Sequence, residues 1–243
     1  MLAVLSPGGS ALAVERVVSL NLCTDQWLVL LAPEKVAALS PLARDSALSF
    51  VAPQAAGLPM VRASAEAVLA LHPDLVLGAR YGARTTLELL ERAGMRVARL
   101  ELPSDFPGIR LALRTTAVLL GIPDRAEPLI AAMDAGLPLP GPPANALVWL
   151  PRGLTSGPDG MMASVLHQAG LTNTGSGARV GLEVLLRRPP AWLILSENSG
   201  GASLATDMLK HPAVRAIRSR AVPAPLTICP GPFTVEAVAL LAR

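Results

Sequence analysis

Four arginines and one tyrosine stand where a ligand could be held through its oxygen atoms. They follow short apolar runs that we predict to be strands, or precede a predicted helix: Arg44, Arg62, Arg80, Tyr81 and Arg152. A guanidinium group holds a carboxylate or a hydroxamate through two parallel hydrogen bonds. If these side chains surround one cleft, their chemistry is the capture of an anionic or oxygen-rich ligand.

Aromatic residues add to this candidate binding set. The chain has three Trp, one Tyr and three Phe, and three of these seven rings lie at or just beyond the end of a predicted strand: Tyr81, Trp149 and Phe233. Aromatic faces supply large apolar contacts at low entropic cost, so this concentration favours ligand contact. Trp149 is equally suited to a core. Asn21, which follows the first predicted strand, completes the set.

Signatures of catalysis are missing from the sequence. There is no Gly-x-Ser-x-Gly nucleophile elbow and no Gly-x-x-x-x-Gly-Lys-Ser/Thr phosphate loop, and Gly175, Gly177 and Gly181 miss the dinucleotide-binding spacing by one residue. The three histidines are dispersed, and no His, Cys, Asp or Glu cluster has the spacing of metal ligands. We expect no catalytic residue and no cofactor, and we expect any metal to arrive with the ligand.

An enzyme with two nucleotide-binding lobes, such as a glycosyltransferase, is the alternative of another class. It would need Gly-rich turns that hold phosphate and a carboxylate placed as general base. Asp25, Asp159 and Glu197 are available carboxylates, but none lies in such a turn. The sequence therefore favours a binding protein over this enzyme.

Composition limits the other classes. The chain has 243 residues, 51% of them apolar and 16% charged, with a formal net charge of +3. No apolar run approaches the ~20 residues of a membrane span. The basic residues are scattered without interleaved aromatics, so a nucleic-acid surface is not indicated. This length suits one large domain or two small lobes.

Apolar runs and their boundaries predict strands that alternate with helices. The predicted strands are residues 17–20, 36–39, 75–78, 97–100, 146–150, 192–195 and 226–229. The predicted helices include one capped by Thr24, one capped by Ser64, and residues 85–93, 106–120, 161–169, 182–187 and 235–241. Such alternation indicates parallel sheets covered by helices, with ligands beyond the carboxyl ends of the strands.

The fold class that follows is α/β, with two Rossmann-like lobes joined by a single connecting helix and a ligand cleft between them. We predict an N-terminal lobe over residues 14–122, a connecting helix with a proline-rich exit over 123–143, and a C-terminal lobe over 144–243. The exit contains four prolines within residues 136–143, which cannot continue a helix.

The first 13 residues indicate export. They contain a short apolar stretch, a Pro-Gly-Gly break and a small-x-small pattern at residues 11–13, as in the rear half of a signal peptide. A frayed tail is the alternative. The two cysteines, Cys23 and Cys229, match no metal motif. A disulfide across the cleft is conceivable in an oxidising periplasm, but two free thiols are the state we expect.

Four segments of the chain together resemble the helical-backbone (class III) substrate-binding proteins of ABC importers. They are residues 16–21, 64–76, 162–173 and 229–232. Members of this family take up ferric siderophores, cobalamin and haem. The resemblance spans about residues 15–243. It implies two Rossmann-like lobes joined by a helix, a ligand held between them, and delivery to a membrane permease with its ATPase. We therefore expect a periplasmic monomer.

The resemblance also assigns roles to single residues. Arg62 and Tyr81 fall where hydroxamate-siderophore binders of the family place an arginine and a tyrosine on the ligand. This predicts a ferric siderophore as ligand, with cobalamin or haem as the alternative. Glu183 matches the glutamate through which the C-terminal lobe docks on permease arginines. The matching position of the N-terminal lobe falls near Thr86, and Glu88 is the carboxylate that could serve there.

Overall fold

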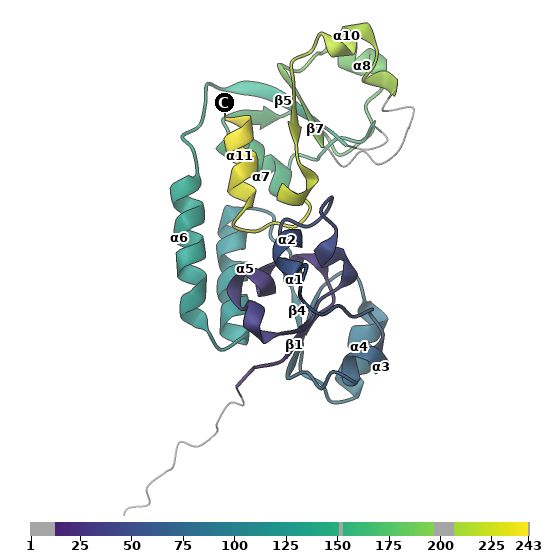
Figure 1. Cartoon of the computed structure of the whole chain (residues 1–243). Helices are drawn as coiled ribbons and strands as arrows, with labels where there is room; N and C mark the ends of the chain where they lie inside the picture. The colour runs from purple at the N-terminus through teal and green to yellow at the C-terminus, as the bar shows by residue number, and fades with distance from the viewer. Residues whose placement is uncertain (1–12, 151–152, 197–206, 243) are drawn as a thin grey trace, which may run out of the picture.

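The computed structural model describes residues 13–150, 153–196 and 207–242. Each half of the chain forms one four-stranded parallel sheet with helices on its faces (Figure 1). This confirms the predicted α/β fold class. The expected signal peptide or tail, apart from Ala13, lies outside the described residues. Among the described helices, none combines the length and the apolar character needed to cross a membrane.

The N-terminal lobe contains a sheet in the order β2-β1-β3-β4. Its strands are β1 (Val17–Ser19), β2 (Val36–Ala38), β3 (Leu75–Ala79) and β4 (Val97–Leu100). Its helices are α1 (Leu22–Leu31), α2 (Ala52–Ala55), α3 (Ala65–Leu69), α4 (Arg84–Arg92) and α5 (Phe106–Leu119), with short 3₁₀ turns at Pro33–Lys35 and Pro41–Arg44. The two inner strands are buried throughout because helices cover both faces of the sheet.

The C-terminal lobe repeats this arrangement in the order β6-β5-β7-β8. Its strands are β5 (Ala144–Trp149), β6 (Leu171–Asn173), β7 (Trp192–Ser196) and β8 (Ser219–Val222). Its helices are α7 (Met161–Gln168), α8 (Leu182–Arg187), α10 (Pro212–Arg215) and α11 (Thr234–Leu241), with a 3₁₀ turn at Ala224–Leu226.

The strand predicted at residues 226–229 is wrong. The carbonyl of Ala224 accepts hydrogen bonds from the backbone N–H groups of Thr227 and Ile228, at 3.0 and 2.9 Å, so the chain turns there. The prolines at 223 and 225 favour this turn because each removes a backbone donor. The fourth strand of the sheet is β8, which lies just before the turn and pairs with β7.

Helix caps were predicted with mixed success. The Ser64 side chain accepts a hydrogen bond from the N–H of Ala67 and caps α3, as predicted. The cap at Thr24 is wrong, because Asn21 caps α1 by accepting from the N–H of Cys23. Thr24 lies within α1 and is fully buried. Its hydroxyl instead forms a 2.8 Å hydrogen bond with the Ser19 hydroxyl, at the end of β1.

A single helix, α6 (Ala126–Gly136), connects the lobes and runs antiparallel to α5 of the N-terminal lobe. After α5 a short turn at Pro123–Arg125 leads into α6, which packs on α5 and α11 and runs alongside both lobes (Figure 1). Bidentate pairs of Arg110 with Asp134 and of Arg114 with Glu127 join α5 to α6. The largest apolar cluster includes buried residues of both lobes, so the lobes share one core.

Candidate functional site

The carboxyl edge of the N-terminal sheet brings together three of the predicted ligand contacts. Strands β1 and β3 are neighbours, so Asn21 after β1 and the segment Arg80–Gly82 after β3 meet at this edge. A Cβ added to Gly82 would lie 3.9 Å from Nδ2 of Asn21. Gly82 has φ +86°, a left-handed conformation that glycine adopts without strain. The chain therefore turns back sharply here and presents Arg80 and Tyr81 outward.

Tyr81, the chain's one tyrosine, is 72% exposed. The guanidinium carbon of Arg80 lies 6.0 Å from the centroid of the Tyr81 ring, and Arg80 Nη1 lies 3.5 Å from the Glu101 carboxylate. Both side chains border a pocket of about 570 Å³ whose other lining residues are Gly82, Arg84, Glu88, Glu91 and Arg99. An exposed phenol beside a guanidinium offers an oxygen donor and a cation to one ligand.

Arg62 lies on a segment that extends the same sheet. Met60 pairs with Leu39 in a parallel bridge, and the N–H of Val61 donates to the Leu39 carbonyl at 2.8 Å. The Thr86 hydroxyl donates to the Ala63 carbonyl at 2.8 Å, which ties this segment to α4. Arg62 is exposed, and its side chain forms no hydrogen bond with a described residue. Its guanidinium therefore remains available to a ligand.

Arg44 has a structural role that the sequence did not indicate. Its guanidinium donates to the carbonyls of Ala55 and Leu58, the first at 3.2 Å from Nε. These bonds fasten the 3₁₀ turn Pro41–Arg44 to the end of α2. We therefore do not retain Arg44 among the ligand contacts. Arg152 lies outside the described residues.

The two other aromatic candidates are core residues. Trp149 is 4% exposed and packs among Leu147, Leu185 and Leu193. Phe233 is also 4% exposed and stacks on Phe50, with ring centroids 4.3 Å apart and planes 12° apart. Neither ring offers a face to a ligand in this structure, so the expectation that they contact a ligand is not carried further.

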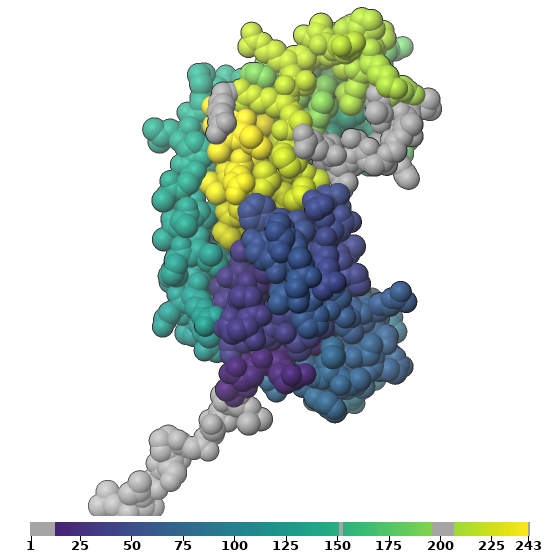
Figure 2. Space-filling view, in the orientation of Figure 1, coloured from purple at the N-terminus to yellow at the C-terminus, as the bar shows by residue number. Residues whose placement is uncertain are grey.

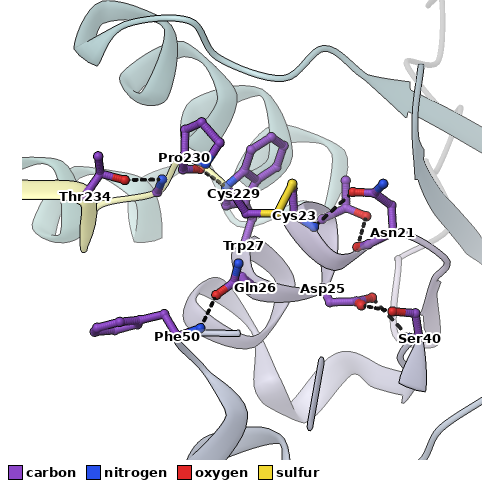
Figure 3. Close-up of a disulfide and its surroundings, with 12 residues drawn as sticks. Asn21, Cys23, Asp25, Gln26, Trp27, Ser40, Phe50, Cys229, Pro230 and Thr234 are labelled. Carbon is purple, nitrogen blue, oxygen red and sulfur yellow. Dashed lines mark hydrogen bonds between the residues drawn. A yellow bond between two sulfur atoms is a disulfide. The ribbon is translucent and has the colours of Figure 1, made fainter. Parts of the chain in front are cut away.

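Three contacts join the lobes at one place, and Figure 3 shows two of them, the disulfide and the Trp27 hydrogen bond. Cys23 at the start of α1 forms a disulfide with Cys229, and the Trp27 indole N–H donates to the Pro230 carbonyl at 2.8 Å. The stack of Phe50 on Phe233 is the third contact. Figure 2 shows the yellow C-terminal segments seated directly on the N-terminal lobe. We call residues 23, 27, 50, 229, 230 and 233 the lobe junction.

The expectation of two free thiols is therefore wrong. Cys229 follows a 3₁₀ turn rather than a strand, and that turn carries it onto the first residues of α1. The two Cα atoms lie 4.9 Å apart, well inside the range that a disulfide spans. The disulfide was conceivable from the sequence, but only the structure brings together two cysteines separated by 206 residues.

A buried carboxyl group lies between the lobe junction and the sheet edge. Asp25 is fully buried, and the Ser40 hydroxyl and backbone N–H both donate to its side chain. Burial raises the pKa of Asp25 to about 7, while the hydrogen bonds from Ser19 and Ser40 oppose this rise. From the sequence Asp25 was only an available carboxylate. The one signal of its burial was its place among the apolar residues of α1.

The two predicted docking glutamates differ in availability. Glu183, in the first turn of α8, has an 85% exposed side chain that pairs with Arg187 at 3.1 Å. Glu88 on α4 has a 40% exposed side chain paired with Arg84 at 2.8 Å, and this hydrogen bond lowers the pKa of Glu88. Glu88 also borders the pocket beside Tyr81. Glu183 is thus the more accessible of the two carboxylates.

No group of three or more His, Cys, Asp or Glu side chains within residues 13–150, 153–196 and 207–242 could hold a metal ion. The oxygen donors at the sheet edge belong instead to isolated tyrosine and amide groups. The carboxyl edge of the N-terminal sheet therefore suits a ligand that is recognised through hydrogen bonds and ionic contacts.

Comparisons with known proteins agree with this architecture. A family model described as periplasmic binding protein matches residues 17–222. A search of curated protein sequences finds no significant match. The periplasmic haem-binding protein RhuT from Roseiflexus sp. RS-1 matches with a TM-score of 0.75 and 25% identity, covering 94% of this chain and 98% of that one.

Two further solved structures share the fold at lower identity. A possible iron-binding periplasmic solute-binding protein from Staphylococcus epidermidis matches with a TM-score of 0.77 and 19% identity over 95% of this chain and 98% of that one. The vitamin B12 binding protein BtuF of Vibrio cholerae matches with a TM-score of 0.69 and 19% identity over 95% and 96%.

Proposed function

We propose, on the premise that this chain belongs to the periplasmic binding protein family, that it captures a ferric siderophore between its lobes and delivers it to an ABC permease. The protein is periplasmic and of the ABC transporter type. Its family and its structural neighbours are transport binding proteins, so the two-lobed enzyme is not retained.

One observation carries the ligand proposal: the exposed pair Arg80 and Tyr81 beside Asn21, at the carboxyl edge of the N-terminal sheet. Ligands of open α/β sheets bind at this edge. The described groups there are a guanidinium, a phenol and an amide, with the guanidinium of Arg62 on the adjoining segment. They match the carboxylate and hydroxamate oxygens of a ferric chelate.

The burial of Trp149 and Phe233 argues against a flat macrocycle. A corrin or a porphyrin exposes large apolar faces, which bind most favourably against aromatic or aliphatic walls. The two rings that could have supplied such walls are each 4% exposed. A polar chelate needs no such wall. This favours the siderophore over cobalamin.

Haem is the second candidate, because the phenol oxygen of Tyr81 is exposed and tyrosine is a known ligand of haem iron. RhuT, named as a haem-binding protein, is 25% identical to this chain. If haem is the ligand, the Soret band of haem will shift when haem binds to the protein. Tyr81→Phe will abolish that shift.

The metal in this proposal belongs to the ligand, and the protein itself holds no cofactor. The loaded protein acts as a monomer and docks on permease arginines through Glu183, whose side chain is 85% exposed. Glu88 is retained as the N-terminal docking candidate, although its pair with Arg84 must open first.

Tyr81→Ala and Arg62→Ala are each expected to weaken binding of the ferric siderophore about 5- to 150-fold. This corresponds to about 1–3 kcal/mol, the usual effect of losing a hydrogen bond to a charged group or a buried aromatic contact. Titration of intrinsic fluorescence with ferrichrome, ferrioxamine, ferric citrate, haem and cyanocobalamin, corrected for inner-filter absorption, measures this.

Arg96→Ala is the matched control, because Arg96 is exposed and precedes β4 at the opposite edge of the same sheet. It should leave the dissociation constant unchanged. Should both site variants bind every ferric chelate as tightly as the parent protein, the ligand does not bind at this edge. Saturation by cyanocobalamin alone would replace the siderophore.

A further inference from the structure

A second pocket lies at the amino edge of the C-terminal sheet. Its volume is about 530 Å³, and its lining is Ala144, Pro189, Pro190, Ala191, Trp192, Ala213, Ala216, Ile217 and Arg218. Ala144 and Trp192 are the first residues of β5 and β7. Helices α8 and α10 lie at the end of this lobe farthest from the N-terminal lobe (Figure 1). The pocket floor is almost entirely apolar.

Trp192 in this pocket carries two arginines on its ring. The guanidinium carbons of Arg220 and Arg218 lie 4.1 and 5.8 Å from the ring centroid, both within cation–π range. Trp192 is partly exposed, whereas Trp27 and Trp149 are buried, with exposed fractions of 0% and 4%. An indole and a guanidinium thus stand together at the opening.

The rim of the pocket is basic. Arg218 lines the pocket, and Arg188 and Arg215 directly precede the lining residues Pro189 and Ala216 in the chain; all three arginines are exposed. None of them forms an ion pair with a carboxylate of the described residues, whereas Arg187 nearby is paired with Glu183. Among the described residues, one guanidinium group without an ion pair, that of Arg218, therefore lines an apolar floor, and two more stand on residues next to the lining in the chain.

We propose that this pocket binds the headgroup region of an anionic phospholipid. The arginines complement the phosphate, and the prolines, alanines and Ile217 accept the apolar part that adjoins it. Tryptophan and arginine at a boundary between water and apolar groups are typical of membrane interfaces. An acidic peptide fits less well, because the floor itself presents one charged side chain, Arg218.

The position of the pocket suits this role. Pro189 and Pro190 follow α8, the helix that bears Glu183, and α8 packs against α10. A C-terminal lobe that docks on a permease through Glu183 of α8, a contact that rests on the proposed function, would bring the pocket toward the surrounding bilayer. Lipid binding itself does not depend on the identity of the transported ligand.

The test uses vesicles of phosphatidylcholine alone and of phosphatidylcholine with 30% phosphatidylglycerol, without permease. At about 0.15 M salt the parent protein should co-sediment at least tenfold more with the anionic vesicles. Arg215→Glu with Arg218→Glu should reduce this binding at least fivefold. The matched pair Arg92→Glu with Arg96→Glu, on exposed positions of the N-terminal lobe, has the same net charge and should stay within twofold of the parent.

Brominated phosphatidylglycerol reports the site directly, because bromine quenches tryptophan only at contact. We expect quenching in the parent protein and its loss in Trp192→Phe, since the other two tryptophans are buried. Siderophore titration of the Arg215/Arg218 variant should match the parent, which separates this proposal from the proposed function. Equal loss in both charge-reversal pairs, or quenching that survives Trp192→Phe, would overturn it. So would saturation by soluble glycerol phosphate or an acidic peptide without vesicle binding.

Discussion

Removing the Cys23–Cys229 disulfide is expected to lower the free energy of unfolding by about 5 kcal/mol, because the bond restricts the unfolded chain over a very long loop. The two cysteines are separated by 206 residues, so reduction frees almost the whole chain. Guanidinium chloride unfolding of the parent protein and of Cys23→Ala with Cys229→Ala measures the difference. A loss this large is a substantial part of the total stability of an ordinary domain.

The controls for this experiment follow from the geometry of the junction. Reductant should destabilise the parent protein but leave the double alanine variant unchanged. Thiol counting in denaturant without reductant should find no reactive group in the parent. Two reactive thiols there, or equal stability of parent and variant, would contradict the disulfide. Trp27→Phe should cause a smaller loss, since it removes one hydrogen bond to Pro230 and replaces the indole with a smaller aromatic ring.

The disulfide also affects how the lobes respond to a ligand. It joins α1 to the C-terminal lobe, while α6 connects the lobes along their length. Two such links and a shared core leave little freedom for hinge opening. We infer that ligand selection depends on exposed side chains such as Tyr81 more than on wide closure of the lobes.

A second large effect is expected from pH through Asp25. Burial raises its pKa to about 7, above the value of 3.8 that applies to the unfolded chain. The folded state therefore holds a proton that the unfolded state has released, between pH 4 and pH 7. The contribution of Asp25 to the free energy of unfolding is fully present below about pH 4 and is lost as the pH rises to about 7. Between pH 5 and pH 8 we expect a loss of about 2–3 kcal/mol.

Urea unfolding at pH 5, 6, 7 and 8 tests this expectation in the parent protein and in Asp25→Asn. The variant cannot ionise, so its stability should change much less over this range. Asp124→Asn, at an exposed position in the turn before α6, is the control and should retain the parental pH dependence. A parental slope that persists in Asp25→Asn would assign the effect to another group.

Much of the N-terminal lobe was predictable because its signals are local. Short β-branched runs end at polar or proline residues, Ser64 caps the helix that follows it, and Gly94 adopts φ +82° after α4. Exposure of Tyr81 was also predictable, since it lies between an arginine and a glycine in a polar loop. These features depend on neighbours within a few residues along the chain.

The roles of the aromatic rings and of the cysteines could not be predicted from their neighbours along the chain. Trp149 and Phe233 lie at the ends of apolar segments whether they face a ligand or a core, and only packing against Leu185 and Phe50 decided for the core. Likewise, Arg44 donates hydrogen bonds to backbone carbonyls of α2 and of the residues after it, and this contact decided against a ligand role. Such outcomes depend on which surfaces meet in space.

By itself, then, the sequence determined the class of the fold, the alternation of strands and helices, and the exposed polar edge with Arg62 and Tyr81. Periodicity and helix caps suffice for these because they act over one or two turns of chain. The tertiary structure alone decided that Cys23 meets Cys229, that Asp25 is buried, and that Trp192 stands between arginines at a basic pocket. Each of these joins segments whose proximity comes from the packing of whole elements, which no short stretch of sequence encodes.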